Sequence, residues 1–265
     1  MTRSAERVAG AVRHWLAQPR EGALTLGLCG SQGSGKSTLA EALKSALEAE
    51  GRRVAVLSLD DLYLGRNARA QLARSIHPLF ATRGVPGTHD TACGVALLDA
   101  VRAGNAVTLP RFDKGRDEPA PEGEAVPAGL DLLLFEGWCV GARPQDAEAL
   151  AVPVNALERD EDPEGVWRGQ VNALLGGSYA DLFARIDRLV LLAAPGFEVV
   201  RGWRGQQEDA LRARVTRGKS TQVMDDAALD RFVQHYERLT RHILAEMPGR
   251  ADLVLHLAAD RSLID

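Results

Sequence analysis

One segment has residue types and spacing that predict phosphate chemistry: Gly30-Ser31-Gln32-Gly33-Ser34-Gly35-Lys36-Ser37. It matches GxxxxGK[ST] at every fixed position and lies between an apolar stretch and a helical pattern. Its glycines let successive N–H groups turn onto phosphate oxygens, and the helix N-terminus adds its positive dipole end. We expect Lys36 to reach the β- and γ-phosphates, Ser37 to offer its hydroxyl to Mg²⁺, and Thr38 to approach the α-phosphate. The segment therefore predicts a nucleoside triphosphate site.

Several classes of nucleotide-binding protein share such a loop, and the rest of the sequence separates them. A GTP switch would carry a guanine-reading NKxD segment after a later strand, and the sequence contains none. Ring-forming and helicase-type ATPases fit poorly with a compact chain whose sequence pI is about 5.9. A small-molecule kinase needs a base for the acceptor hydroxyl, a carboxylate for magnesium or its waters, and arginines that close over the phosphoryl group.

The sequence supplies a candidate for each of these three roles. Asp60 ends the second predicted strand and could accept the hydroxyl proton, because ligands gather at the carboxyl ends of parallel strands. Glu136 ends a later strand and could hold Mg²⁺ through water. Arg204 and Arg201 lie on a predicted lid helix that also carries Arg212 and Arg214. The alternatives are a helix cap for Asp60, an ordinary loop carboxylate for Glu136 and a solvated surface for the arginines.

The acceptor site is predicted in glycine- and proline-rich loops, where specificity residues collect on a rigid scaffold. Cationic side chains in these loops would suit an anionic acceptor such as a carboxylate, although half of the candidates could simply face water. The residues assigned to the acceptor are Asp61, Tyr63, Arg83, His89, Asp90, Arg111, Asp113 and Lys114. Either Asp60 or Asp61 could take the proton, and the sequence leaves this choice open.

Strands alternating with helices are expected to position these residues. Apolar strand patterns occur at 23–29, 53–59, 107–109, 130–135, 188–193 and 253–257. The five longer patterns, separated by helices, predict an α/β fold with a five-stranded parallel sheet covered by helices on both faces, and 107–109 is predicted as a short strand. We also expect an amphipathic helix within 1–18, an active-site loop at 110–129, a continuous helix at 166–185, and a helical lid at about 198–217. With no clear linker, residues 1–265 are read as one domain.

Composition limits the remaining classes of function. The chain has 265 residues, a formal net charge of −4 and no continuous apolar run of about 18 residues, so neither a nucleic-acid coat nor a membrane span is expected. Its three cysteines, Cys29, Cys93 and Cys139, are far apart and form no CxxC pair. This pattern excludes a disulfide framework and suits a reducing, cytoplasmic location. The oligomeric state stays open.

Several further segments, taken together, resemble one kinase family. SLDDLY at 58–63 is similar to the second strand of the uridine kinase, phosphoribulokinase and pantothenate kinase group. Five further segments more specifically resemble the plant-type D-glycerate 3-kinase family. They are RGVPGTHD (83–90), LPRFDKG (109–115), LLFEGWCVG (133–141), WRxQxE (203–208) and FVxxY (232–236). These blocks occur in family order and cover the chain from about residue 24 to its end.

The resemblance implies a P-loop kinase fold in which the strand before the phosphate loop lies beside the strand ending at Glu136. It also implies that ATP and Mg²⁺ are used and that the γ-phosphoryl passes to the 3-hydroxyl of D-glycerate. By position, Asp60 matches the proposed base and Arg204 the lid arginine. Two other hypotheses remain: a kinase of another small hydroxylated acceptor (a nucleoside or pantothenate-like acid), and a nucleotide-binding regulatory protein without turnover.

Overall fold

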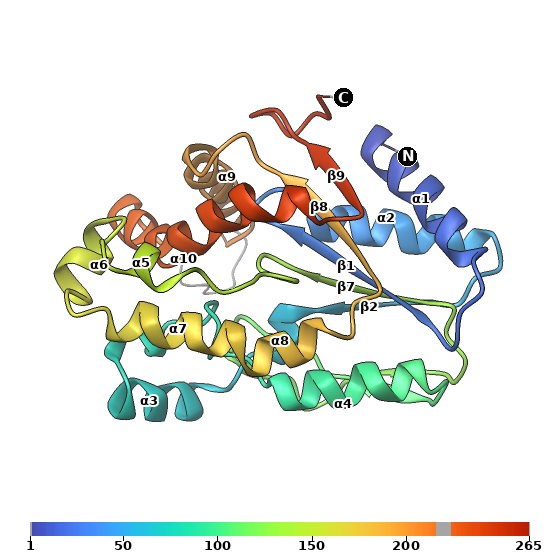
Figure 1. The fold of residues 1–265 in the computed structure, drawn as a ribbon, viewed down its shortest axis with the longest axis horizontal. Helices are drawn as coiled ribbons and strands as arrows, with labels where there is room; N and C mark the ends of the chain where they lie inside the picture. Colours follow the sequence, from blue (N-terminus) through green and yellow to red (C-terminus); the bar gives the residue numbers. More distant parts are fainter. Residues whose placement is uncertain (1, 216–223, 265) are drawn as a thin grey trace.

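The centre of the molecule is a five-stranded parallel sheet (Figure 1). A computed structural model describes residues 2–215 and 224–264, with the side chains of its ninth helix described as far as residue 209. The strands are β1 (Leu24–Gly30), β2 (Val54–Ser58), β7 (Leu132–Gly137), β8 (Arg188–Ala193) and β9 (Leu253–His256), in the order β2-β7-β1-β8-β9. All four neighbouring pairs are parallel, which confirms the predicted fold class.

The register of the three strands β2, β7 and β1 brings their carboxyl ends to one edge. Glu136 of β7 lies opposite Leu28 of β1 on one side and opposite Ser58 of β2 on the other. The strand that leads into the phosphate loop therefore has the strand of Glu136 as its direct neighbour, as the family resemblance implies. Asp60 comes two residues after Ser58, in the short 3-10 helix η1 (Leu59–Leu62) at the same edge.

Helices cover both faces of the sheet because residues alternate along its strands. One set of strand residues, including Leu26, Leu28 and Leu134, packs under α1 (Arg3–Leu16) and α2 (Lys36–Ala49). The alternate set, including Leu133 and Phe135, packs under α4 (Thr91–Arg102), α8 (Ser178–Phe183) and α10 (Asp226–Glu246). Figure 1 shows α2 on one side of β1 and β7, and α4 and α8 on the other. Burying both faces explains why the strands read as nearly continuous apolar runs.

The segment at 110–129, predicted to be a loop, instead contains short strands that form antiparallel pairs. β4 (Phe112–Asp113) pairs with β5 (Glu118–Pro119) to make a small hairpin, and β6 (Glu124–Val126) pairs with β3 (Val107–Leu109). The strand expected at 107–109 thus lies outside the main sheet. Pairs this short carry too few residues for an alternating pattern, so the sequence did not reveal them.

Two other expectations about helices also need correction. The helix predicted over 166–185 is divided at Gly176–Gly177 into α7 (Val166–Gly176) and α8, because two successive glycines weaken the helix and the backbone of Gly177 leaves helical geometry. The segment at 141–165, to which the sequence analysis assigns no helix or strand, contains α5 (Ala147–Leu150) and α6 (Ala156–Glu161).

Three of the remaining elements lie around the edge where the strands end: α3 (Arg66–Ser75), the 3-10 turn η2 (Pro78–Ala81) and α9 (Glu198–Val215). The 3-10 turn η3 (Met247–Gly249) connects α10 to the start of β9, at the opposite edge. α9 occupies the predicted lid position, and residues 216 and 217 of the predicted lid lie outside the described part of the chain, as do the side chains of Arg212 and Arg214. Among the described helices, none is long and apolar enough to cross a membrane.

Candidate active site

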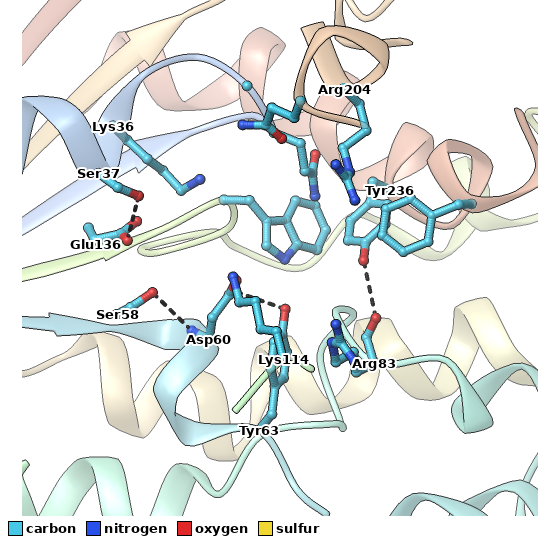
Figure 2. Close-up of a pocket in the computed structure, with 15 residues that line it drawn as sticks. Lys36, Ser37, Ser58, Asp60, Tyr63, Arg83, Lys114, Glu136, Arg204 and Tyr236 are labelled. Carbon is cyan, nitrogen blue, oxygen red and sulfur yellow. Dashed lines mark hydrogen bonds and ion pairs between the residues drawn. The ribbon is translucent and has the colours of Figure 1, made fainter. Parts of the chain in front are cut away.

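A cavity of about 490 Å³ opens at the carboxyl ends of β1, β2 and β7 (Figure 2). One wall comes from the phosphate loop, α9 and α10, and the facing wall comes from the end of β2, η1 and the β4–β5 hairpin. The lining residues are Gln32, Gly33, Lys36, Ser37, Ser58, Asp60, Tyr63, Arg83, Lys114, Glu136, Trp138, Arg204, Gln207, Phe232 and Tyr236. The cavity thus brings together residues from most of the segments singled out in the sequence.

The phosphate loop has the backbone that its glycines predict. Gly33 and Gly35 have φ values of 76° and 90°, which favour glycine, and Gly35 immediately precedes α2. A Cβ atom on Gly33 would lie 2.6 Å from the Cβ of Trp203 on α9, so this glycine also allows α9 to pack on the loop. The hydroxyls of Ser31 and Ser34 are buried without a hydrogen-bond partner in the described chain. Unpaired polar groups in such a loop fit a site for phosphate oxygens.

Ser37 and Glu136 form the pair expected to hold the metal. The Ser37 hydroxyl donates a hydrogen bond of 2.9 Å to Oε1 of Glu136, which is buried. Oε2 of Glu136 has no partner among the described residues, although a buried carboxylate oxygen normally accepts a hydrogen bond or binds a cation. Hydroxyl and carboxylate oxygens are suitable Mg²⁺ ligands, particularly together with substrate phosphates. These two side chains therefore fit Mg²⁺.

Asp60 sits at the cavity wall with a donor on each carboxylate oxygen. The Tyr63 hydroxyl donates to Oδ1 at 2.8 Å, and the Lys114 ammonium donates to Oδ2 at 2.6 Å. Burial raises the pKa of Asp60, but the charges of Lys114 and Lys36 and these hydrogen bonds outweigh burial and lower it to about 2. Asp60 is thus ionised at neutral pH and faces the space in front of Lys36.

Asp61 has the opposite orientation, and its hydrogen bonds stabilise the edge of the sheet at which the strands end. Its Oδ2 accepts hydrogen bonds from Nη1 of Arg111 at 2.9 Å and from the Ser58 amide at 3.4 Å, and its Oδ1 accepts one from the Phe112 amide at 3.2 Å. Arg111 also pairs with Glu124. Asp61 and Arg111 were predicted to bind the acceptor, but they hold the hairpin against η1 and lie outside the cavity lining.

Two arginines line the cavity, and each forms an ion pair with a carboxylate that lies outside the cavity lining. Arg83 forms an ion pair with Asp117, and its guanidinium carbon lies 5.6 Å from the centre of the Phe112 ring. Arg204 pairs with Glu208 one helical turn along α9 and lies 5.5 Å from the Phe232 ring. Figure 2 shows Arg204 pointing from α9 into the cavity. Arg201 instead makes an exposed ion pair with Asp230 and does not line this cavity.

Three other predicted acceptor residues have local structural contacts instead. His89 lies behind Tyr63, with the two rings stacked at 4.7 Å, and its Nδ1 is 2.5 Å from the Tyr179 hydroxyl. Asp90 caps α4 by accepting a hydrogen bond from the Cys93 amide, and Asp113 accepts hydrogen bonds from two amides in its own turn. In the nucleotide set, the Thr38 side chain is exposed on α2 and lies outside the lining.

The structure also brings residues into the cavity that the sequence analysis did not assign to it. They are Ser58, Trp138, Gln207, Phe232 and Tyr236. The Trp138 indole donates to the Gly84 carbonyl at 2.7 Å, and the Tyr236 hydroxyl donates to the Arg83 carbonyl at 3.1 Å. Both contacts hold the 83–90 turn against the cavity. Trp138 directly follows the end of β7, and Tyr236 belongs to the FVxxY motif.

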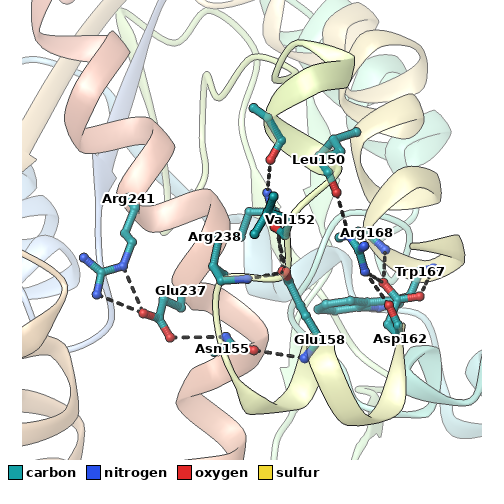
Figure 3. Close-up of polar contacts among 12 residues, drawn as sticks. Leu150, Val152, Asn155, Glu158, Asp162, Trp167, Arg168, Glu237, Arg238 and Arg241 are labelled. Carbon is teal, nitrogen blue, oxygen red and sulfur yellow. Dashed lines mark hydrogen bonds and ion pairs between the residues drawn. The ribbon is translucent and has the colours of Figure 1, made fainter. Parts of the chain in front are cut away.

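A buried ion pair fixes the position of α10, which carries Phe232 and Tyr236 (Figure 3). The Arg238 guanidinium donates to both carboxylate oxygens of Glu158 on α6 at 2.8 and 2.7 Å. It also donates to the carbonyls of Ala149 and Val152, each at 2.6 Å. Because Glu158 and Arg238 are buried, this set of contacts ties α10 firmly to the 147–161 segment.

The chain is similar to known kinases in sequence and in fold. The uncharacterized kinase mug58 of Schizosaccharomyces pombe is 38% identical over 224 residues, covering 80% of this chain and 77% of the relative. The chloroplastic D-glycerate 3-kinase of Arabidopsis thaliana is 29% identical over 249 residues, covering 89% of this chain and 52% of the relative. A solved D-glycerate 3-kinase from Cryptococcus neoformans var. grubii shares the fold, with a TM-score of 0.81 at 23% identity and coverage of 100% and 99%.

A second similarity concerns the amino-terminal part. The sequence profile of the methylmalonyl Co-A mutase-associated GTPase MeaB family matches residues 6–62. This range contains α1, the phosphate loop and β2, and it is less than half of the chain. Since a phosphate loop recurs in many nucleotide-binding proteins and the guanine-reading NKxD segment is absent from the sequence, the match indicates the shared phosphate-binding part.

Proposed function

Because the chain belongs to the family of P-loop kinases that includes mug58 and plant-type D-glycerate 3-kinase, we propose that it phosphorylates the 3-hydroxyl of D-glycerate, giving 3-phosphoglycerate. The chain is an ATP-dependent phosphotransferase, as its relatives are named kinases. The identity of the acceptor and the roles of the individual side chains are what the proposal adds.

The single observation that carries the proposal is the position of Asp60. Its carboxylate lines the cavity together with Lys36 of the phosphate loop, so a base and a phosphate-binding cation face one space. Figure 2 shows Lys36 and Asp60 on opposite walls. An acceptor hydroxyl between them would lie near the proton acceptor on one side and the γ-phosphate on the other, which is the arrangement that phosphoryl transfer needs.

The proposed reaction is an in-line displacement at phosphorus. The acceptor hydroxyl oxygen attacks the γ-phosphorus, Asp60 accepts the hydroxyl proton, and the bond between the γ-phosphorus and the bridging oxygen breaks so that ADP leaves with its electrons. Lys36 and Arg204 hold the phosphoryl oxygens while negative charge builds up on them. Ser37 and Glu136 would hold Mg²⁺, which would supply positive charge to the phosphates. The α9 lid keeps water from competing with the acceptor.

An acidic acceptor is favoured by the charges on the acceptor side of the cavity. Arg83 and Lys114 line it there, and a carboxylate is the small group that pairs best with such cations. Tyr63, Trp138 and Tyr236 add aromatic rings to the cavity lining. A small hydroxy acid would therefore bring a carboxylate to these cations, whereas a nucleoside would bring them no anionic group.

The test is ADP release by the full chain with ATP–Mg²⁺ and a panel of acceptors. D-glycerate heads the panel, followed by L-glycerate, pantothenate, uridine and ribose, with the product identified by mass and NMR. We expect D-glycerate to give the highest kcat/KM and 3-phosphoglycerate as product. Turnover of pantothenate or a nucleoside in place of glycerate would retain the kinase and reject the acceptor. ATP binding without turnover of any acceptor would favour a regulatory protein.

A further inference from the structure

Lys114 lines the acceptor side of the cavity and forms its ion pair with Asp60, the proposed base. Arg83 and Arg204 pair with Asp117 and Glu208, carboxylates that lie outside the cavity lining. Lys114 instead places its ammonium 2.6 Å from Oδ2 of Asp60. A lysine in this position adds a second donor to a carboxylate that already accepts a hydrogen bond from Tyr63. An acceptor hydroxyl would have to compete with an ammonium for Asp60.

The hairpin that carries Lys114 is fixed, while the Lys114 side chain is free to move. Asp117 pairs with Arg83 and with the buried Arg69, and Glu118 pairs with Arg66 of α3. Asp61 accepts a hydrogen bond from the hairpin amide of Phe112. By contrast, the Lys114 side chain is 60% exposed. A lysine has a flexible stem and a point charge, so its ammonium can change partners without movement of the hairpin.

We propose that Lys114 is a specificity-determining residue that holds Asp60 in an ion pair until the carboxylate of an acceptor takes over its ammonium. An acid in the cavity offers Lys114 a second carboxylate close to Arg83, and the exchange leaves Asp60 with its Tyr63 hydrogen bond and an open Oδ2. A neutral acceptor or water offers no such exchange. This inference rests on the proposed function in one respect, the acidic nature of the acceptor.

Two consequences follow from the exchange. In the absence of acceptor, Asp60 stays paired, so ATP is protected from hydrolysis by water in the cavity. Because Lys114 helps to lower the pKa of Asp60, its departure also makes Asp60 a stronger base at the time when the acceptor is present. Acceptors are then selected by their charge as well as by their fit, which links substrate recognition to activation of the base.

The test compares Lys114→Met with the control Arg116→Met in the full-length protein. Arg116 is an exposed cation of the same hairpin that lies outside the cavity lining. Two rates are measured with ATP–Mg²⁺: ADP release without acceptor, and kcat/KM for D-glycerate and for glycerol, its analogue without a carboxylate. We expect Lys114→Met to raise the acceptor-free rate several-fold and to lower the preference for the acid by about 10- to 100-fold. Arg116→Met is expected to leave both quantities within about twofold of wild type.

A pH profile separates this role from a merely structural one. Removal of the Lys114 charge raises the pKa of Asp60, so the acidic limb of kcat/KM moves to higher pH in Lys114→Met. The limb stays in place in Lys114→Arg, which keeps the charge.

An unchanged rate of ADP release without acceptor, together with an unchanged preference for the acid, would overturn the proposal. If the wild type fails to phosphorylate D-glycerate, the proposed function is rejected. The rates of ADP release without acceptor then still test the role of the Lys114–Asp60 ion pair. A higher rate in Lys114→Met supports that role, and an unchanged rate rejects it.

Discussion

Asp60 and Asp61 are neighbours in the chain, but their surroundings give them different properties. Asp60 faces the cavity, where Lys114 and Lys36 outweigh burial and lower its pKa. For Asp61, burial is the larger influence and raises its pKa despite the ion pair with Arg111. Asp61 is also the residue that anchors the hairpin through the Phe112 amide. The geometry therefore favours Asp60 as the base and gives Asp61 a supporting position.

We expect Asp60→Asn to lower kcat by about 10²- to 10⁴-fold, because the amide cannot accept the hydroxyl proton. Its affinity for ATP should change little, since Lys36 and the phosphate loop are untouched. The matched control is Asp61→Asn, which should keep most of kcat and raise KM as the hairpin loosens. Steady-state kinetics with an ATP-binding measurement on both variants would check this. Similar losses of kcat in the two variants would speak against Asp60 as the base.

At the scale of elements, α10 is the helix whose position matters most for the acceptor side. It presents Phe232 and Tyr236 to the cavity, and the Tyr236 hydroxyl holds the Arg83 carbonyl. The helix is fixed by Arg238, whose guanidinium is enclosed by Glu158 and two backbone carbonyls (Figure 3). A few residues further along, Arg241 pairs with Glu237 at the surface, with 47% of its side chain exposed.

These two pairs give a direct comparison on a single helix. We expect Arg238→Ala to lower the free energy of unfolding by about 3–5 kcal/mol, because it leaves the Glu158 carboxylate buried without its partner. Arg241→Ala should cost under about 1 kcal/mol, since the Arg241 side chain is exposed and Glu237 keeps the Asn155 amide as a partner. Chemical denaturation of both variants measures the difference. Equal, small losses would mean that α10 does not depend on the Glu158 pair for its position.

At the scale of the whole molecule, two buried histidines make stability depend on pH. Burial lowers the pKa of His89, between Tyr63 and Tyr179, to about 4, and burial with the charge of Arg231 lowers that of His235 to about 4. In the unfolded chain each would titrate near its ordinary pKa of about 6.5. Between these values the unfolded chain binds more protons than the native one, so acid favours unfolding.

We therefore expect the free energy of unfolding to fall as the pH is lowered from about 6.5 to 4. The greatest slope is about 1.4 kcal/mol per pH unit for each histidine. His89→Gln should reduce the slope by about half, and a surface variant, His14→Gln, should leave it unchanged. Denaturation series at several pH values measure the slopes. Carboxylates with a lowered pKa, such as Asp117, add their own loss below about pH 4, outside this window.

The phosphate loop, the parallel sheet and the candidate residues at its edge could be predicted from the sequence alone. Gly30–Ser37 is a local motif whose conformation follows from its own glycines, and Asp60 and Glu136 follow strands whose carboxyl ends must meet in a parallel sheet. Both kinds of inference depend on residues that are close in sequence or on a regular repeat. They needed no knowledge of side-chain packing between distant segments.

The tertiary structure alone decided which side chains of the loops reach the cavity. His89 and Asp90 stand next to each other in a motif, yet one stacks behind Tyr63 and the other caps α4. Lys114 meets Asp60 because the hairpin folds back over η1, a contact between residues more than fifty positions apart. Such contacts are set by the packing of α3, α10 and the hairpin, whose many weak interactions leave no spacing pattern in the sequence.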